Sequence, residues 1–221
     1  MPAERSNRSK KSDSIPSPRK RPTVSAQTRT DLLTAAENCL RESGYAAFST
    51  RQVALFADVP LSQIHYHFGS KQGLVLALFE ALNERLLQRQ TQMFERDLPL
   101  WRQWEIACDF LEDDLTSGYV RVLNELAAAG WSDPQIADAI RQAVNGWHSL
   151  LLHVARRASK KFKGLGPLQP GDMAALVGNV FLGAEVSILS GHERKDFPVR
   201  RALRRFGRLI RQLEESAQIG G

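Results

Sequence analysis

The segment of residues 49–74 constrains the fold most strongly, because it reads as two short helices joined by a tight turn and followed by a longer helix. Ser49 and Gln52 have the S-x-x-Q spacing of a capping box, in which a hydroxyl and an amide pair with open backbone N–H groups at a helix start. Asp58 stands at the turn, where a residue that tolerates left-handed backbone is favoured. Pro60 suits a first helical turn, where its missing N–H is not needed. Together these signals predict two helices connected by a tight turn.

The two helices of this motif are expected to use their surfaces differently. The first is expected to bury an apolar side made of Val53, Ala54, Phe56 and Ala57. In the second, over residues 61–68, Ile64 and Phe68 lie at i and i+4 and are expected to face the core. The opposite side then carries polar and aromatic residues that suit base edges and phosphates in the DNA major groove. An ordinary helical hairpin with a polar turn has the same spacing, so spacing alone leaves both interpretations open.

The predicted contacts with DNA extend to the starts of the neighbouring helices. Ser70 and Lys71 restart the chain as a capped helix, whose basic charge and free N–H groups suit a phosphate. The predicted DNA contacts are Thr50, Arg51, Leu61, Ser62, Gln63, His65, Tyr66, His67 and Lys71.

This stretch resembles the helix-turn-helix of the TetR family of bacterial transcriptional regulators. The resemblance rests on Thr50, Arg51, Val53, Ala54, Val59, Ile64, the run His65-Tyr66-His67-Phe68, Ser70, Lys71 and Leu74. The preceding helix, over residues 26–44, also matches the family through Leu33, Ala36 and Tyr45.

Three positions depart from the family pattern. Asp58 replaces the usual glycine of the turn, and Pro60 stands where serine is common. His65 replaces a tyrosine that commonly contacts a phosphate in this family. The resemblance therefore assigns this contact either to His65, which carries charge only when protonated, or to Tyr66.

The rest of the chain reads as further helices. No period-two strand pattern appears, so the predicted fold class is all-α. The expected helices cover residues 25–43, 71–93, 98–116, 119–129, 134–159 and 171–190, with a last apolar pattern over 199–213. The polar, basic composition of residues 1–24 predicts a disordered arm. The resemblance implies a helix-turn-helix DNA-binding domain over 25–75 and a helical ligand-binding and dimerisation domain over 76–221.

Positive charge is concentrated in the arm rather than in the predicted DNA-binding domain. The chain has a formal charge of +6, and residues 1–25 contain seven basic and two acidic residues, whereas residues 26–75 contain four of each. The arm is expected either to follow DNA phosphates or a minor groove, or to be a solvated tail. No apolar signal-peptide core follows the basic residues, and no stretch approaches 18 apolar residues. We therefore expect a cytoplasmic protein without a membrane segment.

All four tryptophans fall in the expected second domain, which binds small molecules in the family. Aromatic residues with a few polar groups suit an apolar pocket, although most aromatic residues of helical proteins belong to the core. The candidate contacts for a small, partly apolar effector are Trp101, Trp104, Phe110, Tyr119, Asn124, Glu125, Trp147 and His148. Cys39 and Cys108 lie in apolar helical patterns and are predicted to be buried thiols, and no redox or metal-binding motif is present.

Apolar stripes on the last two expected helices suit a four-helix interface between two subunits, as the family resemblance implies. The predicted interface residues are Val177, Val180, Phe181, Ala184, Ile188, Leu203, Phe206 and Ile210. The alternatives are packing within one subunit and an arginine-rich helix that lies on a membrane.

These features predict a homodimeric repressor that binds a double-stranded DNA operator and is released by a small-molecule effector. The alternative is the same dimer acting as an activator or co-regulator. A helical enzyme is the remote alternative, because the sequence contains no Gly-rich phosphate loop, no G-x-S-x-G elbow and no H-E-x-x-H pair. No cofactor is expected.

Overall fold

The computed structural model describes residues 24–45, 47–162, 164 and 166–219, and in these ranges the chain forms α-helices and no β-strand. The predicted all-α class is therefore confirmed for the described part of the chain. The arm predicted over residues 1–24 lies outside the described residues except for Val24, which begins the first helix. The helices are α1 (Val24–Ser43), α2 (Thr50–Phe56), α3 (Ser62–Phe68), α4 (Lys71–Phe94), α5 (Leu100–Ser117), α6 (Tyr119–Ala129), α7 (Pro134–Lys161), α8 (Pro170–Leu189) and α9 (Val199–Ile219).

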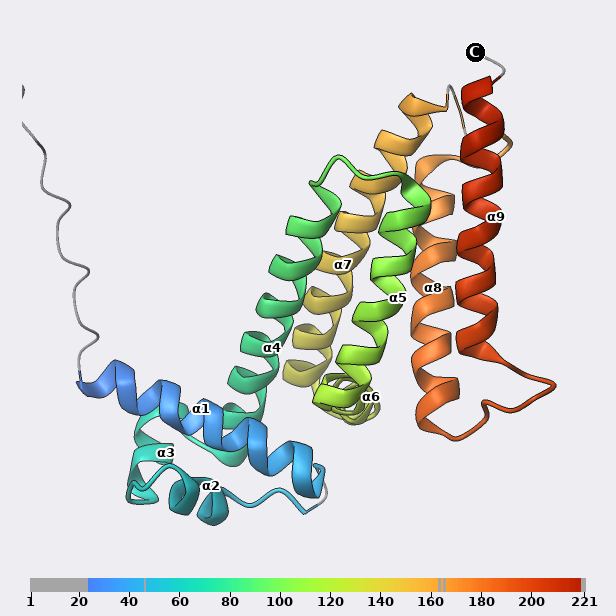
Figure 1. Ribbon diagram of the computed structural model, residues 1–221. Coiled ribbons are helices and arrows are strands. Elements are labelled where there is room, and N and C mark those ends of the chain that lie inside the picture. Colours follow the sequence, from blue (N-terminus) through green and yellow to red (C-terminus); the bar gives the residue numbers. More distant parts are fainter. Residues whose placement is uncertain (1–23, 46, 163, 165, 220–221) are drawn as a thin grey trace, which may run out of the picture.

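Helices α1, α2 and α3 form a small head at one end of the molecule, and α4 rises from this head into a bundle of longer helices (Figure 1). The head is held by side chains such as Leu32, Val53, Ile64 and Leu74, each of which is completely removed from solvent. Burial of each such side chain contributes about 1.5–3 kcal/mol to folding. Gly44 ends α1 as expected, with a left-handed φ of 72° and its N–H donating to the carbonyl of Leu40.

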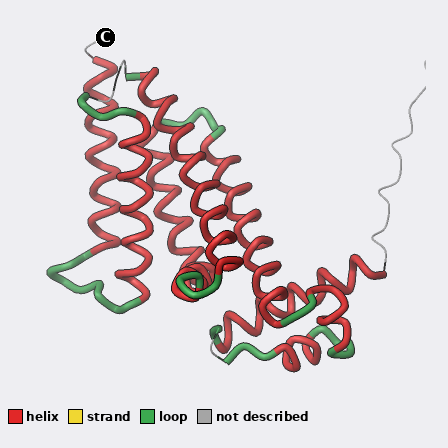
Figure 2. Tube along the Cα trace, turned by 180° about the vertical axis from the view of Figure 1, so that it is seen from behind, coloured by secondary structure: helices red, strands yellow, loops and turns green. Residues whose placement is uncertain are grey.

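The bundle contains α4 and α5 together with α7, α8 and α9, while α6 lies across its lower end next to the head (Figure 1; Figure 2). One continuous apolar core joins Leu32 of α1, Leu78 of α4, Val120 and Leu126 of α6, and Ile136 of α7. The domain boundary expected after residue 75 falls inside α4, and the head shares its core with α6 and α7. Because these helices share one core, a shift of α6 or α4 changes the packing of the head.

A second core holds the far side of the bundle together and overturns part of the predicted dimer interface. Phe181, Ala184 and Leu203 are buried in this core with Trp104, Cys108 and Leu111. Val177, Ile188 and Ile210 are partly buried against the same cluster. Of the eight predicted interface residues, Val180 and Phe206 remain 48% and 47% exposed. The periodicity correctly identified apolar residues on α8 and α9. It did not separate those that face the core of the subunit, such as Phe181, from those that face outward, such as Val180.

Both cysteines are free and buried, as predicted, and burial raises the pKa of Cys108 to about 11. Within the described ranges, α8 is long and apolar enough to cross a membrane by length and composition alone. The sequence expectation concerned uninterrupted apolar stretches approaching 18 residues, and α8 meets the weaker test of mean hydropathy although polar residues such as Asn179 and Glu185 interrupt it. Core helices of soluble proteins reach the same composition. Helix α8 differs from a fully buried core helix because several of its apolar side chains, such as Leu176 and Val180, are exposed.

Candidate nucleic-acid interface and buried cavity

The turn between α2 and α3 is fixed by local backbone geometry. Asp58 adopts a left-handed φ of 51°, as predicted from its place at the turn. The N–H of Val59 donates to the carbonyl of Ala54 at 3.0 Å, which closes the turn. The side chains of Val53 and Ala54 are buried in the core of the head and so hold α2 in place. The chain therefore enters α3 at a defined angle.

Two details of the predicted α2 were wrong. Ser49 is the N-cap residue of α2, but its side chain makes no capping hydrogen bond, so the expected capping box is absent. Phe56, expected on the apolar side, is 54% exposed. The helix has only seven residues, and Val53 and Ala54 are sufficient to anchor it.

Helix α3 presents polar and aromatic groups from one anchored side. Ile64 is completely buried, and Phe68 packs partly on the core below the guanidinium of Arg29, 5.4 Å from the ring centre. Ser62 and Tyr66 lie on the opposite side of the helix, and Tyr66 is 75% exposed. Both side chains therefore face away from the core of the head.

The other predicted contacts on α3 are either partly buried or close to a backbone carbonyl group. Leu61 is the N-cap residue and packs partly on the core, and Gln63 and His67 are half-buried at the edges of the helix. His65 is exposed, and its Nδ1 lies 3.2 Å from the carbonyl oxygen of Gly69. Because a carbonyl only accepts, Nδ1 carries a proton in this contact, and Nε2 can donate to a phosphate only when the ring is charged. Tyr66 donates without this condition.

The start of α4 is built as predicted. The Ser70 hydroxyl accepts from the N–H of Gly73 at 3.0 Å and so caps the helix. The ammonium of Lys71 lies 5.6 Å and 5.7 Å from the ring centres of Tyr45 and Phe48, which orients this charge while leaving the residue exposed. At the start of α2, Arg51 is exposed and Thr50 is half-buried.

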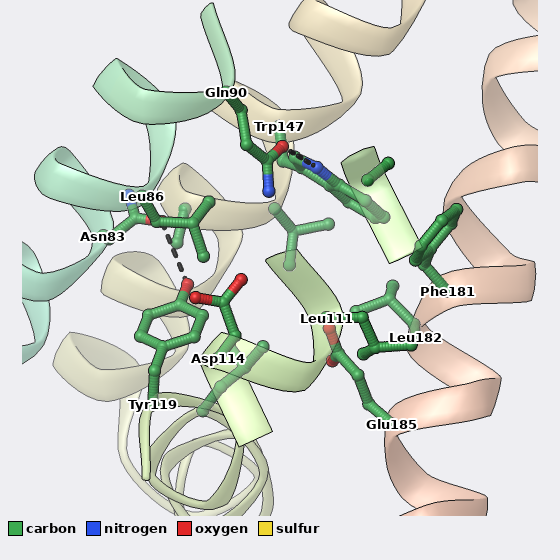
Figure 3. Close-up of a pocket in the computed structure, with 14 residues that line it drawn as sticks. Asn83, Leu86, Gln90, Leu111, Asp114, Tyr119, Trp147, Phe181, Leu182 and Glu185 are labelled. Atoms are coloured by element: carbon green, nitrogen blue, oxygen red, sulfur yellow. Dashed lines mark hydrogen bonds between the residues drawn. The ribbon is translucent and has the colours of Figure 1, made fainter. Parts of the chain in front are cut away.

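A cavity of about 40 Å³ lies between α4, α5, α6, α7 and α8, with side chains from all five helices converging on it (Figure 3). Most of its wall is apolar. The lining residues are Asn83, Leu86, Gln90, Ala107, Leu111, Asp114, Tyr119, Leu123, Ala143, Val144, Trp147, Phe181, Leu182 and Glu185. This volume has room for a few water molecules but is small beside the 300–1,000 Å³ typical of ligand pockets.

Two hydrogen bonds order the polar and aromatic residues of the cavity (Figure 3). The Tyr119 hydroxyl donates to Oδ1 of Asn83 at 3.1 Å. The indole N–H of Trp147 donates to Oε1 of Gln90 at 2.8 Å. Both rings are thus held in fixed orientations by residues of α4.

The two carboxyl groups of the cavity differ in how they are compensated. Asp114 accepts from the guanidinium of Arg89 at 2.7 Å; burial raises the pKa of its carboxyl, and Arg89 opposes this rise. Glu185 has no such partner: its Oε2 is buried without a hydrogen bond, and burial, with a smaller contribution from Asp114, raises its pKa to about 7. The cavity therefore contains one paired and one unpaired acid.

The structure brings only two of the eight predicted effector contacts, Tyr119 and Trp147, to this cavity. Trp104 lies in the second core and donates to the carbonyl of Leu203, Trp101 packs under Arg211, and Phe110 packs under Arg89. Asn124 donates back to the carbonyl of Val120, and His148 faces Gly178. These six side chains, Glu125 among them, are absent from the lining of the cavity.

Sequence reasoning missed four polar lining residues, Asn83, Gln90, Asp114 and Glu185, and it assigned Phe181 to the dimer interface instead of the cavity. A signal for Glu185 was present, because it is the single charged residue in the apolar run over residues 173–190.

Glu125 links the cavity-lining helix α6 to the head. Its Oε2 accepts from the backbone N–H of Tyr45 at 3.1 Å, and its Oε1 accepts from Arg121 at 2.9 Å. A second link joins Gln72 at the start of α4 to Asp133 before α7, at 2.8 Å. The bundle thus contacts the head through defined hydrogen bonds as well as through the shared core.

Comparison with known proteins agrees with this arrangement. Residues 32–78 match the family model described as bacterial regulatory proteins, tetR family. The HTH-type transcriptional regulator CymR of Pseudomonas putida is 30% identical over 122 residues, which span 53% of this chain and 58% of that regulator. The regulator UidR of Escherichia coli (strain K12) is 21% identical over 180 residues, which span 79% of this chain and 86% of UidR.

Solved structures share the fold over most of their length. A TetR transcription regulator from Haloarcula marismortui ATCC 43049 superposes with a TM-score of 0.70 at 16% identity, covering 85% of this chain and 98% of that chain. A regulator from Saccharomonospora viridis in complex with choline gives a TM-score of 0.67 at 20% identity, and the match covers 81% of this chain and 95% of that chain.

The matched residues 32–78 are those that form most of the head, including the turn at Asp58 and the exposed helix α3. The matched relatives are transcriptional regulators, in agreement with the prediction of a regulator rather than an enzyme. The head thus carries the sequence pattern of the TetR family of bacterial regulatory proteins, and the described chain has the fold of a solved TetR regulator, so the chain is similar to this family.

Proposed function

We propose that this protein is a homodimeric repressor that binds a double-stranded operator through α3 and releases it when a small molecule occupies the cavity of the bundle. The observation that carries the proposal is the outward side of α3, where Ser62, His65 and Tyr66 are exposed while Ile64 fixes the helix from below. Such a surface contributes nothing to the core and suits a major groove.

The proposed contacts with DNA are of two kinds: contacts with base edges, which select the sequence, and contacts with phosphates, which position the head. Ser62 and Gln63 have side chains that exchange hydrogen bonds with base edges, and Tyr66 suits a phosphate or a thymine methyl group. Arg51 and Lys71, at the starts of α2 and α4, carry the positive charge that fixes the head on the phosphate backbone. They are two of the four basic residues in the range 26–75, which also contains four acidic residues, so these two supply a large part of the salt-dependent affinity of the head.

The dimer is proposed to form through exposed apolar rows on α8 and α9, which lie side by side in the bundle (Figure 1). Leu176 and Val180 lie at i and i+4 on α8, and Phe206, Leu209 and Leu213 lie at helical spacing on α9. All five are at least 46% exposed, and burying such a row against its copy makes a symmetric four-helix contact. This revised row replaces the buried residues Phe181, Ala184 and Leu203 of the sequence prediction.

An effector role for the cavity is supported by its lining and by its links to the head. The cavity combines an apolar wall with a few oriented polar groups, which is the usual character of a small-molecule site. A structural relative, the Saccharomonospora viridis regulator, holds choline. Helix α6 supplies Tyr119 to the cavity and Glu125 to the backbone of the head, so an occupant that displaces α6 disturbs the head.

Selection of bound duplexes from a random pool tests this proposal. The dimer should enrich a two-fold-symmetric sequence whose half-sites lie about one helical turn, roughly 34–36 Å, or a multiple apart. Ser62→Ala should change the enriched sequence, whereas Glu95→Gln, at an exposed position after α4, serves as a control and should leave it unchanged. Binding that shows no sequence preference at any salt concentration would exclude an operator-binding role.

A further inference from the structure

We infer that the molecule recognised in the cavity is an organic cation, with an ammonium centre held against Glu185 and an apolar body packed on the surrounding wall. This inference rests on the proposed effector role of the cavity and names the chemistry of the ligand.

The first support is the sign of the charge in the lining. Asp114 and Glu185 are the charged members of the lining set, and both are acidic. Their carboxyl groups enter the space from α5 and α8, on the side of the cavity opposite Gln90 and Trp147 (Figure 3). Lys, Arg and His are missing from the lining set, so an anionic ligand would meet two acids and no cation.

The second support is the unequal compensation of the two acids. Arg89 of α4 pairs with Asp114 and also approaches Asp113 at 3.7 Å, so its charge is already engaged. The buried Oε2 of Glu185 has no hydrogen-bond partner. A buried carboxylate oxygen without a donor is costly, and a bound ammonium supplies both the donor and the counter-charge.

The groups packed around Glu185 do not offer another compensating charge. Asp114 of α5 is acidic, and burial raises the pKa of Tyr119 of α6 far above neutral pH, so the phenol stays uncharged. Asn83 and Gln90 of α4 are neutral. His148 of α7 lies against Gly178 of α8 and outside the lining set. A cation from outside the protein is therefore the partner that Glu185 lacks.

The third support is the aromatic wall. Trp147 and Phe181 approach edge to face with ring centres 6.3 Å apart, and Tyr119 stands on the other side of the cavity (Figure 3). The hydrogen bonds to Gln90 and Asn83 hold the Trp147 and Tyr119 rings in place. Ring faces attract ammonium groups, while the leucine and alanine side chains suit an attached hydrocarbon.

The test compares three molecules with closely related skeletons but different charge: 2-phenylethylammonium, 2-phenylethanol and phenylacetate. Calorimetry at pH 8 on the full-length dimer should give tightest binding of the ammonium, at least about tenfold above the alcohol, and weakest binding of phenylacetate. Glu185→Gln should lower the affinity for the ammonium about tenfold or more and leave the alcohol within about twofold. Glu95→Gln, which removes one exposed carboxylate, should leave all three affinities unchanged.

Proton linkage gives a second readout that a packing defect would not produce. With Glu185 titrating near pH 7, ammonium affinity should fall about tenfold from pH 8 to pH 6, because binding must then displace a proton. Titration in buffers of different ionisation enthalpy should detect this proton at pH 6, and Glu185→Gln should abolish both effects.

Failure of this inference is distinguishable from failure of the effector role. Equal binding of ammonium and alcohol, no binding of the ammonium, or an unchanged Glu185→Gln variant overturns the cation assignment. If an uncharged or anionic molecule nevertheless binds the cavity and releases the selected operator, the proposed function stands. If the ammonium binds through Glu185 but operator affinity does not change, the cation site stands and the effector role falls.

Discussion

Replacing Glu185 by glutamine should stabilise the free protein at alkaline pH and leave its stability nearly unchanged in acid. The folded protein holds the Glu185 proton to about pH 7, whereas the unfolded chain releases it near 4.5. The folded state binds more protons than the unfolded chain between these pH values. The free energy of unfolding of the wild type is therefore undiminished below about pH 4.5 and falls progressively as pH rises to 7. Glutamine imitates the protonated acid and removes this loss.

The size of the effect follows from the two pKa values. A rise from 4.5 to about 7 corresponds to about 3 kcal/mol of free energy of unfolding lost in the wild type above pH 8. Between pH 5 and pH 8 the difference in stability between Glu185→Gln and wild type should grow by about 2.5 kcal/mol, since some of the loss has occurred by pH 5.

Urea unfolding at pH 5, 6, 7 and 8 measures this difference. Protein concentration must be the same throughout, because the stability of a dimer depends on it. Glu95→Gln is the matched control, and its difference from wild type should not vary with pH in this way. A constant difference between Glu185→Gln and wild type from pH 5 to pH 8 would refute the assignment of Glu185 as a buried, uncompensated acid.

Three further perturbations address the interfaces. Val180→Lys or Leu209→Glu should leave monomers at micromolar concentration in sedimentation, whereas Phe181→Leu, in the core, should keep the dimer; a dimeric Leu209→Glu protein would exclude the proposed row. Lys71→Ala should weaken binding to all duplexes alike and lower the salt slope by about one, while Gln63→Ala should change discrimination at one base pair by roughly 1–3 kcal/mol; an unchanged ranking of operator variants after Gln63→Ala would remove that residue from recognition. Glu125→Gln should weaken the contact with the Tyr45 amide and reduce the effect of ligand on operator affinity, measured as the ratio of operator dissociation constants with and without ligand; an unchanged ratio would place the coupling elsewhere.

The head was predictable from sequence because its structure is determined by local chemistry. Asp58 at a left-handed turn, Ser70 at a helix start and Gly44 at a helix end each act within a few residues, and all three were confirmed. Ser49 shows the limit of this reasoning. Its position as N-cap is correct, but its hydroxyl does not make the capping bond, because sequence spacing does not determine the side-chain rotamer.

The cavity was less predictable because aromatic content does not tell which side of a helix faces inward. Trp104 and Trp147 both belong to long amphipathic helices, yet Trp104 fills the second core and Trp147 lines the cavity. Both faces of α8 are apolar, so periodicity did not separate inward Phe181 from outward Val180. Their separation depends on how α8 packs against α5, α7 and α9, which is tertiary information.

The small size of the cavity bears on how an effector would act. A space of about 40 Å³ does not admit a ligand with several carbon atoms unless its walls part, so binding must move side chains or helices of the wall. Helix α6 is short, contributes Tyr119 and Leu123 to the wall, and holds the Tyr45 amide through Glu125. A ligand that displaces α6 therefore strains a contact with the head and shifts the spacing of the two α3 helices in the proposed dimer. Linkage requires that operator binding oppose this displacement by the same factor, so an effector that weakens operator affinity must itself bind less tightly to the operator complex.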